Sequence, residues 1–123
     1  MPETGAQTSI FFEPTPPRSV SVEGRKDDQD KLRYDLIPVR PLAEVARVYT
    51  IGAKKYDDNN WRKGLKWGRV FAAMMRHAWA WMRGERFDPV DGQHHLASVC
   101  WCALALMEYE DTHPELDDRA DIR

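Results

Sequence analysis

Two adjacent histidines, His94 and His95, most directly suggest chemistry in this chain, because imidazoles bind metal ions and move protons near neutral pH. Both stand at the start of an apolar stretch that is expected to be helical. Neighbouring residues of a helix point about 100° apart, so at most one of the two rings faces a shared site. His95 is in register with Ser98 and Cys102. We therefore expect His95 to be functional and His94 to be a solvated residue at the helix start.

Polar groups on two other expected helices can meet His95. His77 is on the inward face of the helix expected over residues 68–83, and Glu44 flanks the inner face of the helix expected over residues 41–56. Helical bundles build cofactor sites from side chains that several helices direct towards a common axis. The sequence therefore predicts a site formed by Glu44, His77 and His95. The alternative is that these groups form a hydrogen-bonded polar cluster in the core.

Basic and aromatic residues around the first two expected helices suit a nucleoside triphosphate. Charge-assisted hydrogen bonds to phosphate oxygens are strong, and aromatic rings stack on bases. The candidates are the basic residues Lys31, Arg33, Lys55 and Arg76 and, in the loop after Lys55, Tyr56, Asn60 and Trp61. The alternative for the basic residues is a solvated surface. We favour that alternative for Arg69 and Arg83, which lie on an outer face of the expected second helix.

Hydrophobic periodicity places helices between two non-helical ends. It predicts helices over residues 41–56 and 68–83, the second with Gly84 as a C-cap. Clustered prolines and the absence of periodicity predict an extended arm at the N-terminus. The expected divisions are an arm over residues 1–24, a helical domain over residues 25–112 and an acidic tail over residues 113–123.

The third helix is expected to begin near residue 89 or 92, with Asp88 or Asp91 as its N-cap, and to end near residue 110. It is apolar on every side from Leu96 to Met107, and two helices cannot readily cover the whole circumference of a third. We therefore expect an all-α fold. Its architecture would be a compact bundle of three main helices that self-association completes as a homo-oligomer.

Composition narrows the class of protein. The chain has 123 residues, 42% of them hydrophobic and 31% charged, which supports a single domain with one modest core. Its net charge of -2 gives no signature of nucleic-acid binding. Its apolar runs are shorter than the roughly 20 residues of a membrane span, so we expect a soluble protein of the cytoplasm. Cys100 and Cys102 lie two apart on the expected helix, which predicts reduced core residues.

Three strings of the sequence carry a family resemblance. They are DQDKLRYDLIP, then LAEVARVYTIGAKKYDDNNWRKG, then RHAWAWMRGERFDPVDGQHHLASVCWCALALMEYE. Over roughly residues 26–110 the chain resembles the small phage and bacterial proteins known as dATP/dGTP diphosphohydrolase, N-terminal-type domains. The resemblance implies an α-helical, metal-dependent enzyme that acts on nucleotides and reshapes the deoxynucleotide pool of a phage-infected cell.

The leading hypothesis is a hydrolase that releases pyrophosphate from dATP-like or dGTP-like substrates in the host cytoplasm, assisted by Mg²⁺ or Mn²⁺. Hard cations favour oxygen ligands, so Glu44 and Asp91 are the expected carboxylate ligands. His77 and His95 would ligate a softer ion or act as general base. The competing hypothesis is a protein that sequesters a nucleotide without cleaving it, or a structural phage component.

Overall fold

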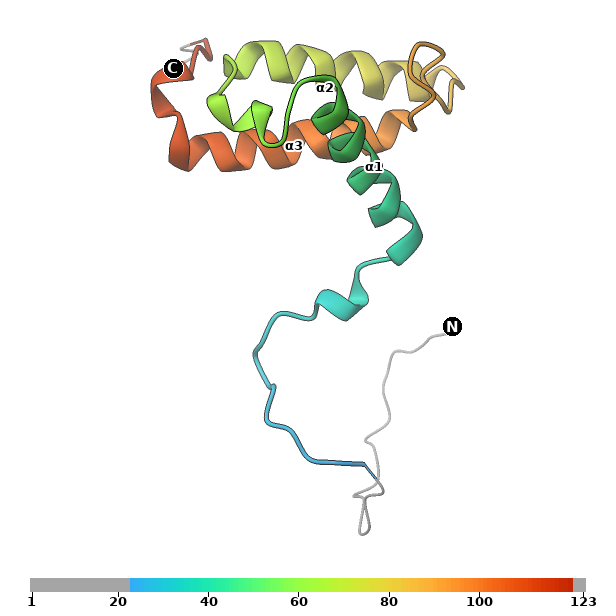
Figure 1. Cartoon of the computed structure of the whole chain (residues 1–123), viewed down its shortest axis with the longest axis vertical. Coiled ribbons are helices and arrows are strands. Elements are labelled where there is room, and N and C mark those ends of the chain that lie inside the picture. The colour runs from blue at the N-terminus through green and yellow to red at the C-terminus, as the bar shows by residue number, and fades with distance from the viewer. Residues whose placement is uncertain (1–22, 121–123) are drawn as a thin grey trace. The chain divides into compact units, whose positions relative to one another are not determined.

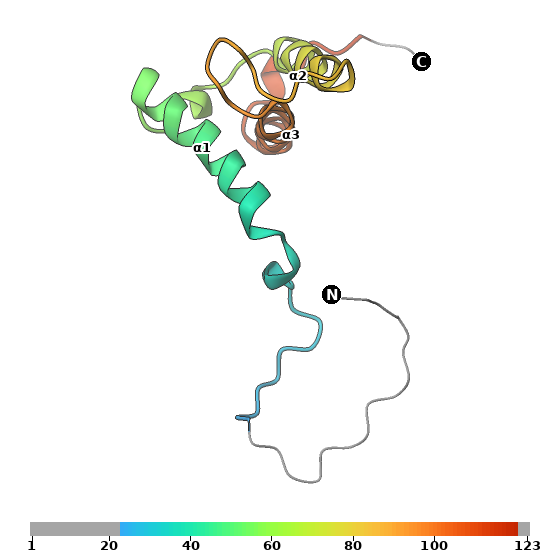
Figure 2. The ribbon, with the colours of Figure 1, turned by 90° about the vertical axis from the view of Figure 1, so that its right-hand side faces the viewer.

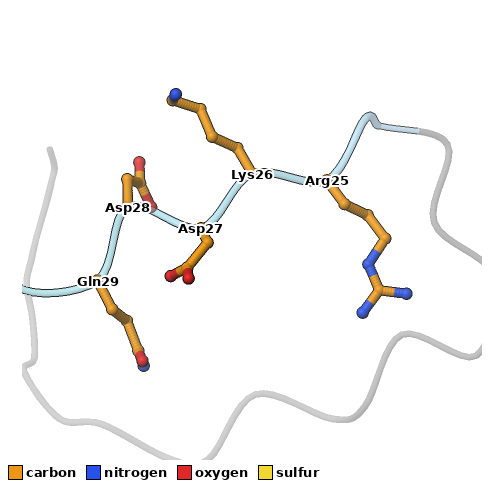
Figure 3. Close-up of a pocket in the computed structure, with 5 residues that line it drawn as sticks. All are labelled: Arg25, Lys26, Asp27, Asp28 and Gln29. Carbon is orange, nitrogen blue, oxygen red and sulfur yellow. The ribbon is translucent and has the colours of Figure 1, made fainter.

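The computed structural model describes residues 23–120 and divides the chain into two units, residues 1–32 and 33–123. The predicted N-terminal arm lies outside the described residues, except for Glu23 and Gly24. In the described part of the first unit, exposed side chains project from an extended run of chain and line an open hollow, as Figure 3 shows for Arg25, Lys26, Asp27, Asp28 and Gln29. The described residues that line this hollow all belong to one short stretch of chain.

The second unit is helical, as predicted. Its elements are η1 (Tyr34–Leu36), α1 (Val39–Lys55), η2 (Asn60–Lys63), α2 (Trp67–Met82), α3 (His95–Thr112) and η3 (Pro114–Leu116). α2 and α3 lie side by side and run in opposite directions, and α1 packs against α3 (Figures 1 and 2). The described residues contain one isolated β-bridge and no strand. The three predicted helices and the all-α class are therefore confirmed.

The expected start of the third helix is wrong. α3 begins at His95, and its N-cap is His94, whose Nδ1 accepts a hydrogen bond from the backbone N–H of Leu96 at 3.1 Å. Asp88 and Asp91, the expected caps, instead accept backbone N–H groups two residues further along, at 2.9 and 3.0 Å. Such local turns compete with helix formation. His94 is thus a structural cap rather than a merely solvated residue.

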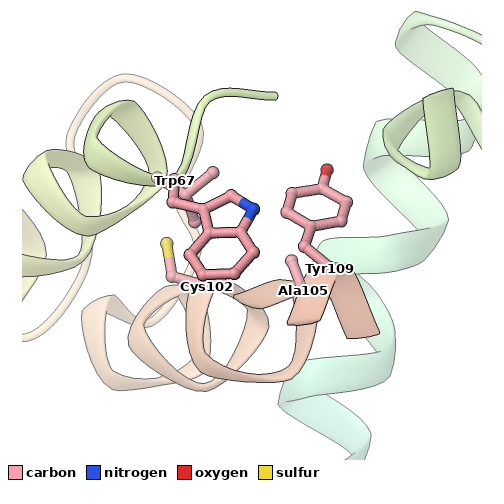
Figure 4. Close-up of a cluster of buried hydrophobic side chains, with 5 residues drawn as sticks. Trp67, Cys102, Ala105 and Tyr109 are labelled. Atoms are coloured by element: carbon pink, nitrogen blue, oxygen red, sulfur yellow. The ribbon is translucent and has the colours of Figure 1, made fainter. Parts of the chain in front are cut away.

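The core lies between α2 and α3. Trp67 and Val70 of α2 pack against Cys102, Ala105 and Tyr109 of α3 (Figure 4). The hydroxyl of Tyr109, which is fully buried, donates a hydrogen bond to the backbone carbonyl of Trp61 and so ties the loop after α1 to this core. A buried hydroxyl without a partner would destabilise the fold.

The two cysteines differ in environment. Both are free, as predicted, but Cys100 is exposed and only Cys102 is buried, so the expectation that both belong to the core is wrong for Cys100. Burial raises the pKa of the Cys102 thiol to about 11. Since the thiolate is the reactive form, Cys102 is inert at neutral pH.

The segment predicted as an acidic tail packs on the helical body over its described part. Leu116 contacts the core cluster, and Asp118 accepts a hydrogen bond from the backbone N–H of Gly68 at 2.8 Å. Gly64, with φ of 101°, lets this segment approach closely, because a Cβ there would lie 2.6 Å from the His113 ring. Any larger residue at position 64 would displace the segment.

Apolar side chains remain exposed on both long helices of the core. Leu104 and Met107 of α3 are 46% and 64% exposed, although the sequence pattern places the whole helix in a bundle interior. Phe71, Met75, Trp79 and Met82 form a second exposed strip on α2. None of the helices in the described part of the chain is both long enough and apolar enough to cross a membrane.

Candidate functional site

The structure brings together two of the predicted site histidines. His77 lies on α2 and His95 opens α3, and their Nδ1 atoms are 2.9 Å apart. His95 is 4% exposed, whereas His94 is half-buried and engaged in capping. The antiparallel packing of α2 on α3 produces this meeting, because it sets the last turns of one helix beside the first turn of the other.

A carboxylate completes the cluster. Ligand atoms of His77, Asp88 and His95 all lie within 4.8 Å of one another. The 2.9 Å spacing is that of an N–H···N hydrogen bond, and it also suits two nitrogens that bind one octahedral ion at right angles, which would be about 3.0 Å apart for bonds of roughly 2.1 Å. Two imidazoles and one carboxylate are a donor set that first-row divalent metals accept. The cluster is therefore a candidate metal centre.

Glu85 orients His95 from the opposite side. The Nε2 atom of His95 lies 2.7 Å from Glu85 Oε1, and an ionised carboxylate only accepts, so Nε2 carries the proton. The Nδ1 lone pair of a neutral His95 then faces His77 and Asp88. Gly84, with φ of 103°, reverses the chain after α2 and sets Glu85 in place. Carboxylates that hold ligand imidazoles in this way are typical of metal sites.

The electrostatics of His77 favour its neutral form. Burial lowers the pKa of His77, and the neighbouring His95 and Arg76 act in the same direction, while Asp88 and Asp91 partly oppose them. A neutral imidazole keeps a lone pair for a metal ion. With Nε2 of His95 protonated, the 2.9 Å contact is a hydrogen bond from His77 Nδ1–H to His95 Nδ1, so an ion held between the two rings would replace this bond.

A cleft of about 1010 Å³ lies beside the histidines and includes His77 in its wall. The end of α1 and the following loop form one side, and α2, α3 and the loop before α3 form the other. Six of the predicted site residues line it, namely Lys55, Tyr56, Asn60, Trp61, His77 and Asp91. The predicted neighbourhood of basic and aromatic residues around Trp61 is therefore a single concave surface.

Aromatic rings make up much of this surface. The ring of Tyr49 lies 5.9 Å from that of Trp61 and 6.1 Å from that of Trp101, measured between centroids. All three residues line the cleft. Helical spacing marks Tyr49 and Trp101 only as apolar positions, so sequence reasoning missed their role in this wall. These rings give the cleft an aromatic wall, and the Arg62 guanidinium lies 4.5 Å from the centroid of the Trp61 ring.

The remaining predicted site residues, apart from His95, are not among those that line the cleft or form the metal cluster. Glu44 is near Arg47, with a closest N–O distance of 3.5 Å, and Arg33 forms an ion pair with Asp35 at 2.8 Å. Arg76 is exposed on α2. Lys31 belongs to the first unit, where it is also exposed. Neither Glu44 nor Asp91 is among the three residues of the metal cluster.

Comparisons with known proteins agree with the resemblance noted above. The family described as "dATP/dGTP diphosphohydrolase, N-terminal" matches residues 21–119. A protein of Salmonella phage PMBT28 named dATP/dGTP diphosphohydrolase is 36% identical over 96 residues, which is 78% of this chain and 33% of that protein. This chain thus spans about a third of the length of that relative. No solved structure matches it. The chain belongs to the family of dATP/dGTP diphosphohydrolase N-terminal domains.

Proposed function

We propose that the chain is a metal-dependent hydrolase that releases pyrophosphate from purine deoxynucleoside triphosphates such as dATP and dGTP. The observation that carries this proposal is the convergence of His77, Asp88 and His95, because His77 also lines the aromatic cleft. The name of the phage relative supports the substrate class. A role in the nucleotide metabolism of a phage within the host cytoplasm would follow.

The donor set narrows the choice of ion. Mg²⁺ prefers oxygen ligands and retains several waters, whereas nitrogen ligands suit later first-row ions. Of the two ions expected from the sequence, Mn²⁺ fits His77 and His95 better. When bound, such an ion would polarise a phosphate and lower the pKa of a coordinated water. His77, Asp88 and His95 would hold it, and Glu85 would keep the His95 ring in position.

The proposed substrate lies along the cleft. Tyr56 and Trp61, with the rings of Tyr49 and Trp101 beside Trp61, would hold the base. Lys55 would contact the phosphates and balance the negative charge that accumulates during cleavage. Its ammonium lies 5.1 Å from the centre of the Tyr56 ring, so the phosphate-binding and base-binding groups adjoin.

Lys55→Ala is expected to weaken nucleotide binding by about tenfold, the loss of one charged hydrogen bond. Arg83→Ala is the matched control, because Arg83 is exposed on the outer surface after α2 and does not line the cleft. Isothermal titration of each variant with dATP in metal-free buffer measures the effect. Equal losses in the two variants would indicate diffuse electrostatic attraction and would contradict the assignment of Lys55.

The proposed activity is tested by incubating the protein with the four deoxynucleoside triphosphates and with ATP and GTP. Each reaction is run with Mn²⁺, with Mg²⁺ and with a chelator, and the products are separated by anion-exchange chromatography. Metal-dependent formation of a deoxynucleoside monophosphate and pyrophosphate supports the proposal. Tight binding of intact nucleotide would instead support sequestration, and release of triphosphate would place the cleavage at a different bond.

We also propose that the chain forms a homo-oligomer through the exposed strips of α2 and α3. α1 packs against α3, yet it leaves Leu104 and Met107 uncovered. Phe71, Met75, Trp79 and Met82 follow spacings of four, four and three residues, the pattern of a helix face that packs in a bundle. A second copy has matching strips and can cover both helices.

Leu104→Glu should therefore dissociate the oligomer and leave the protomer folded. In a single copy Leu104 is 46% exposed, so a charge there can remain hydrated, whereas in the oligomer it would be buried without a partner. Sedimentation velocity at micromolar concentration, together with circular dichroism, distinguishes the two effects. A monomeric wild type would contradict the proposal, and Lys63→Glu at an exposed polar position serves as the control.

A further inference from the structure

Gln93 has a buried acceptor without a donor. The residue is 6% exposed and stands in the loop before α3, and it lines the cleft. Its backbone is fully engaged, because its carbonyl accepts from the N–H of Asp88 at 2.8 Å and its N–H donates to Asp91 at 3.0 Å. Its side-chain Oε1, however, has no hydrogen-bond partner within the part of the chain that the structure describes.

The orientation of the Gln93 side-chain amide determines which of its two polar atoms has no hydrogen-bond partner. Nε2 donates to Oδ2 of Asp91 at 3.4 Å, and the opposite orientation would set two oxygens against each other. Oε1 is therefore the free atom, and it can only accept. A buried carbonyl that has given up its bonds with water destabilises the fold unless a donor reaches it. An unsatisfied buried group of this kind calls for a partner from outside the protein chain, such as a water, an ion or a ligand.

We propose that Gln93 is a specificity-determining residue whose Oε1 accepts a hydrogen bond from the nucleotide bound in the cleft. This inference rests on the proposed function. The phosphates of an ionised triphosphate carry no donor, so the partner is an N–H or O–H elsewhere on the substrate. dATP offers two such groups, the exocyclic amine of the base and the 3′-hydroxyl of the sugar, and dGTP adds the ring N1–H of guanine.

The long bond to Asp91 allows the amide to respond. At 3.4 Å it is a weak restraint, and the terminal torsion of glutamine is soft. Gln93 lines the cleft, so a modest rotation about this torsion can turn Oε1 towards a bound ligand. Asp91 also lines the cleft and holds the amide only weakly, so its place there does not depend on binding a metal.

The test compares Gln93→Met, which keeps the side-chain length and removes the acceptor, with Gln29→Met at an exposed position outside the cleft. Calorimetry measures binding of the non-hydrolysable α,β-methylene analogue of dATP, and thermal melting is recorded without nucleotide. We expect Gln93→Met to weaken binding about tenfold, the effect of one buried hydrogen bond, without lowering the melting temperature. Gln29→Met should change neither.

Two further analogues identify the donor. One lacks the exocyclic amine and the other lacks the 3′-hydroxyl. The analogue that lacks the true donor should bind wild type about tenfold more weakly and should not be weakened further by Gln93→Met, since the two changes remove one interaction. Gln93→Asn, which withdraws the amide by one methylene, should show the same loss and covers the case in which the methionine variant does not fold.

The outcomes separate the two proposals. Wild-type protein that binds dATP analogues while Gln93→Met binds them equally well would overturn the inference and leave the proposed function intact. A lower melting temperature with unchanged binding would also overturn it, because it would show a structural residue. If the wild-type protein bound no nucleotide, both the proposed function and the inference about Gln93 would be wrong.

Discussion

Replacing His95 by alanine should abolish both metal-dependent hydrolysis and metal binding, whereas replacing His94 by alanine should leave both properties intact. His95 contributes Nδ1 to the cluster with His77 and Asp88, and it is almost fully buried. Mutation of a residue that only orients a metal ligand lowers metal affinity or activity by about 10–100-fold. Removal of the ligand itself should therefore cause a larger loss. His77→Ala should behave like His95→Ala.

His94→Ala has a different expected signature. His94 caps α3 through the bond from Leu96 N–H, and loss of such a cap costs about 1 kcal/mol of stability. This variant should melt at a lower temperature and keep its activity. Metal content by mass spectrometry, turnover and melting temperature are measured on all three histidine variants. Full activity of His95→Ala, or unchanged metal content with a large loss of stability, would show that His77, His95 and Glu85 form a structural polar cluster.

Asp88→Asn should reduce metal affinity and turnover by about 100-fold, the scale of losing one anionic ligand from a three-residue centre. The fold should persist, because asparagine keeps the oxygen that accepts the Val90 N–H. The change therefore removes charge from the metal centre while preserving the turn.

Asp91→Asn is the matched control for Asp88→Asn. It removes the same charge three residues away and likewise preserves the bond to Gln93 N–H. Asp91 belongs to the cleft wall and not to the metal cluster, so its variant should bind metal with nearly wild-type affinity. Titration with Mn²⁺, followed by electron paramagnetic resonance, measures both affinities. A larger loss of Mn²⁺ affinity for Asp91→Asn than for Asp88→Asn would show that Asp91, the ligand expected from the sequence, binds the metal instead of Asp88.

The helices were predictable because their signals are periodic and local. Apolar spacing located α1 and α2 to within a few residues, and the inward direction of His77 follows from its place on the same face as Val70. The prediction of His95 over His94 used direction around one helix, whereas His94 lies outside α3 as its N-cap and the functional role of His95 stays a prediction. Periodicity determines which residues face inward without reference to the rest of the chain.

The groups in loops were not predictable in this way. The sequence favours Asp91 as the carboxylate ligand, whereas the loop before α3 brings Asp88 to the two histidines instead. Glu85 acts on His95 only because the chain reverses at Gly84. These positions depend on backbone direction between helices, which composition and spacing do not encode.

The three groups of the candidate metal centre lie close together in the chain. They fall between residues 77 and 95, within the end of one helix, a connecting loop and the start of the next. Bringing them together closes only short loops and so loses little chain entropy. α1 contributes to the wall of the cleft and provides none of the three groups. On the proposed function, a single helical hairpin would therefore capture the ion. Such a hairpin would be a portable module, which could keep its chemistry while the helix on the other side of the cleft diversifies.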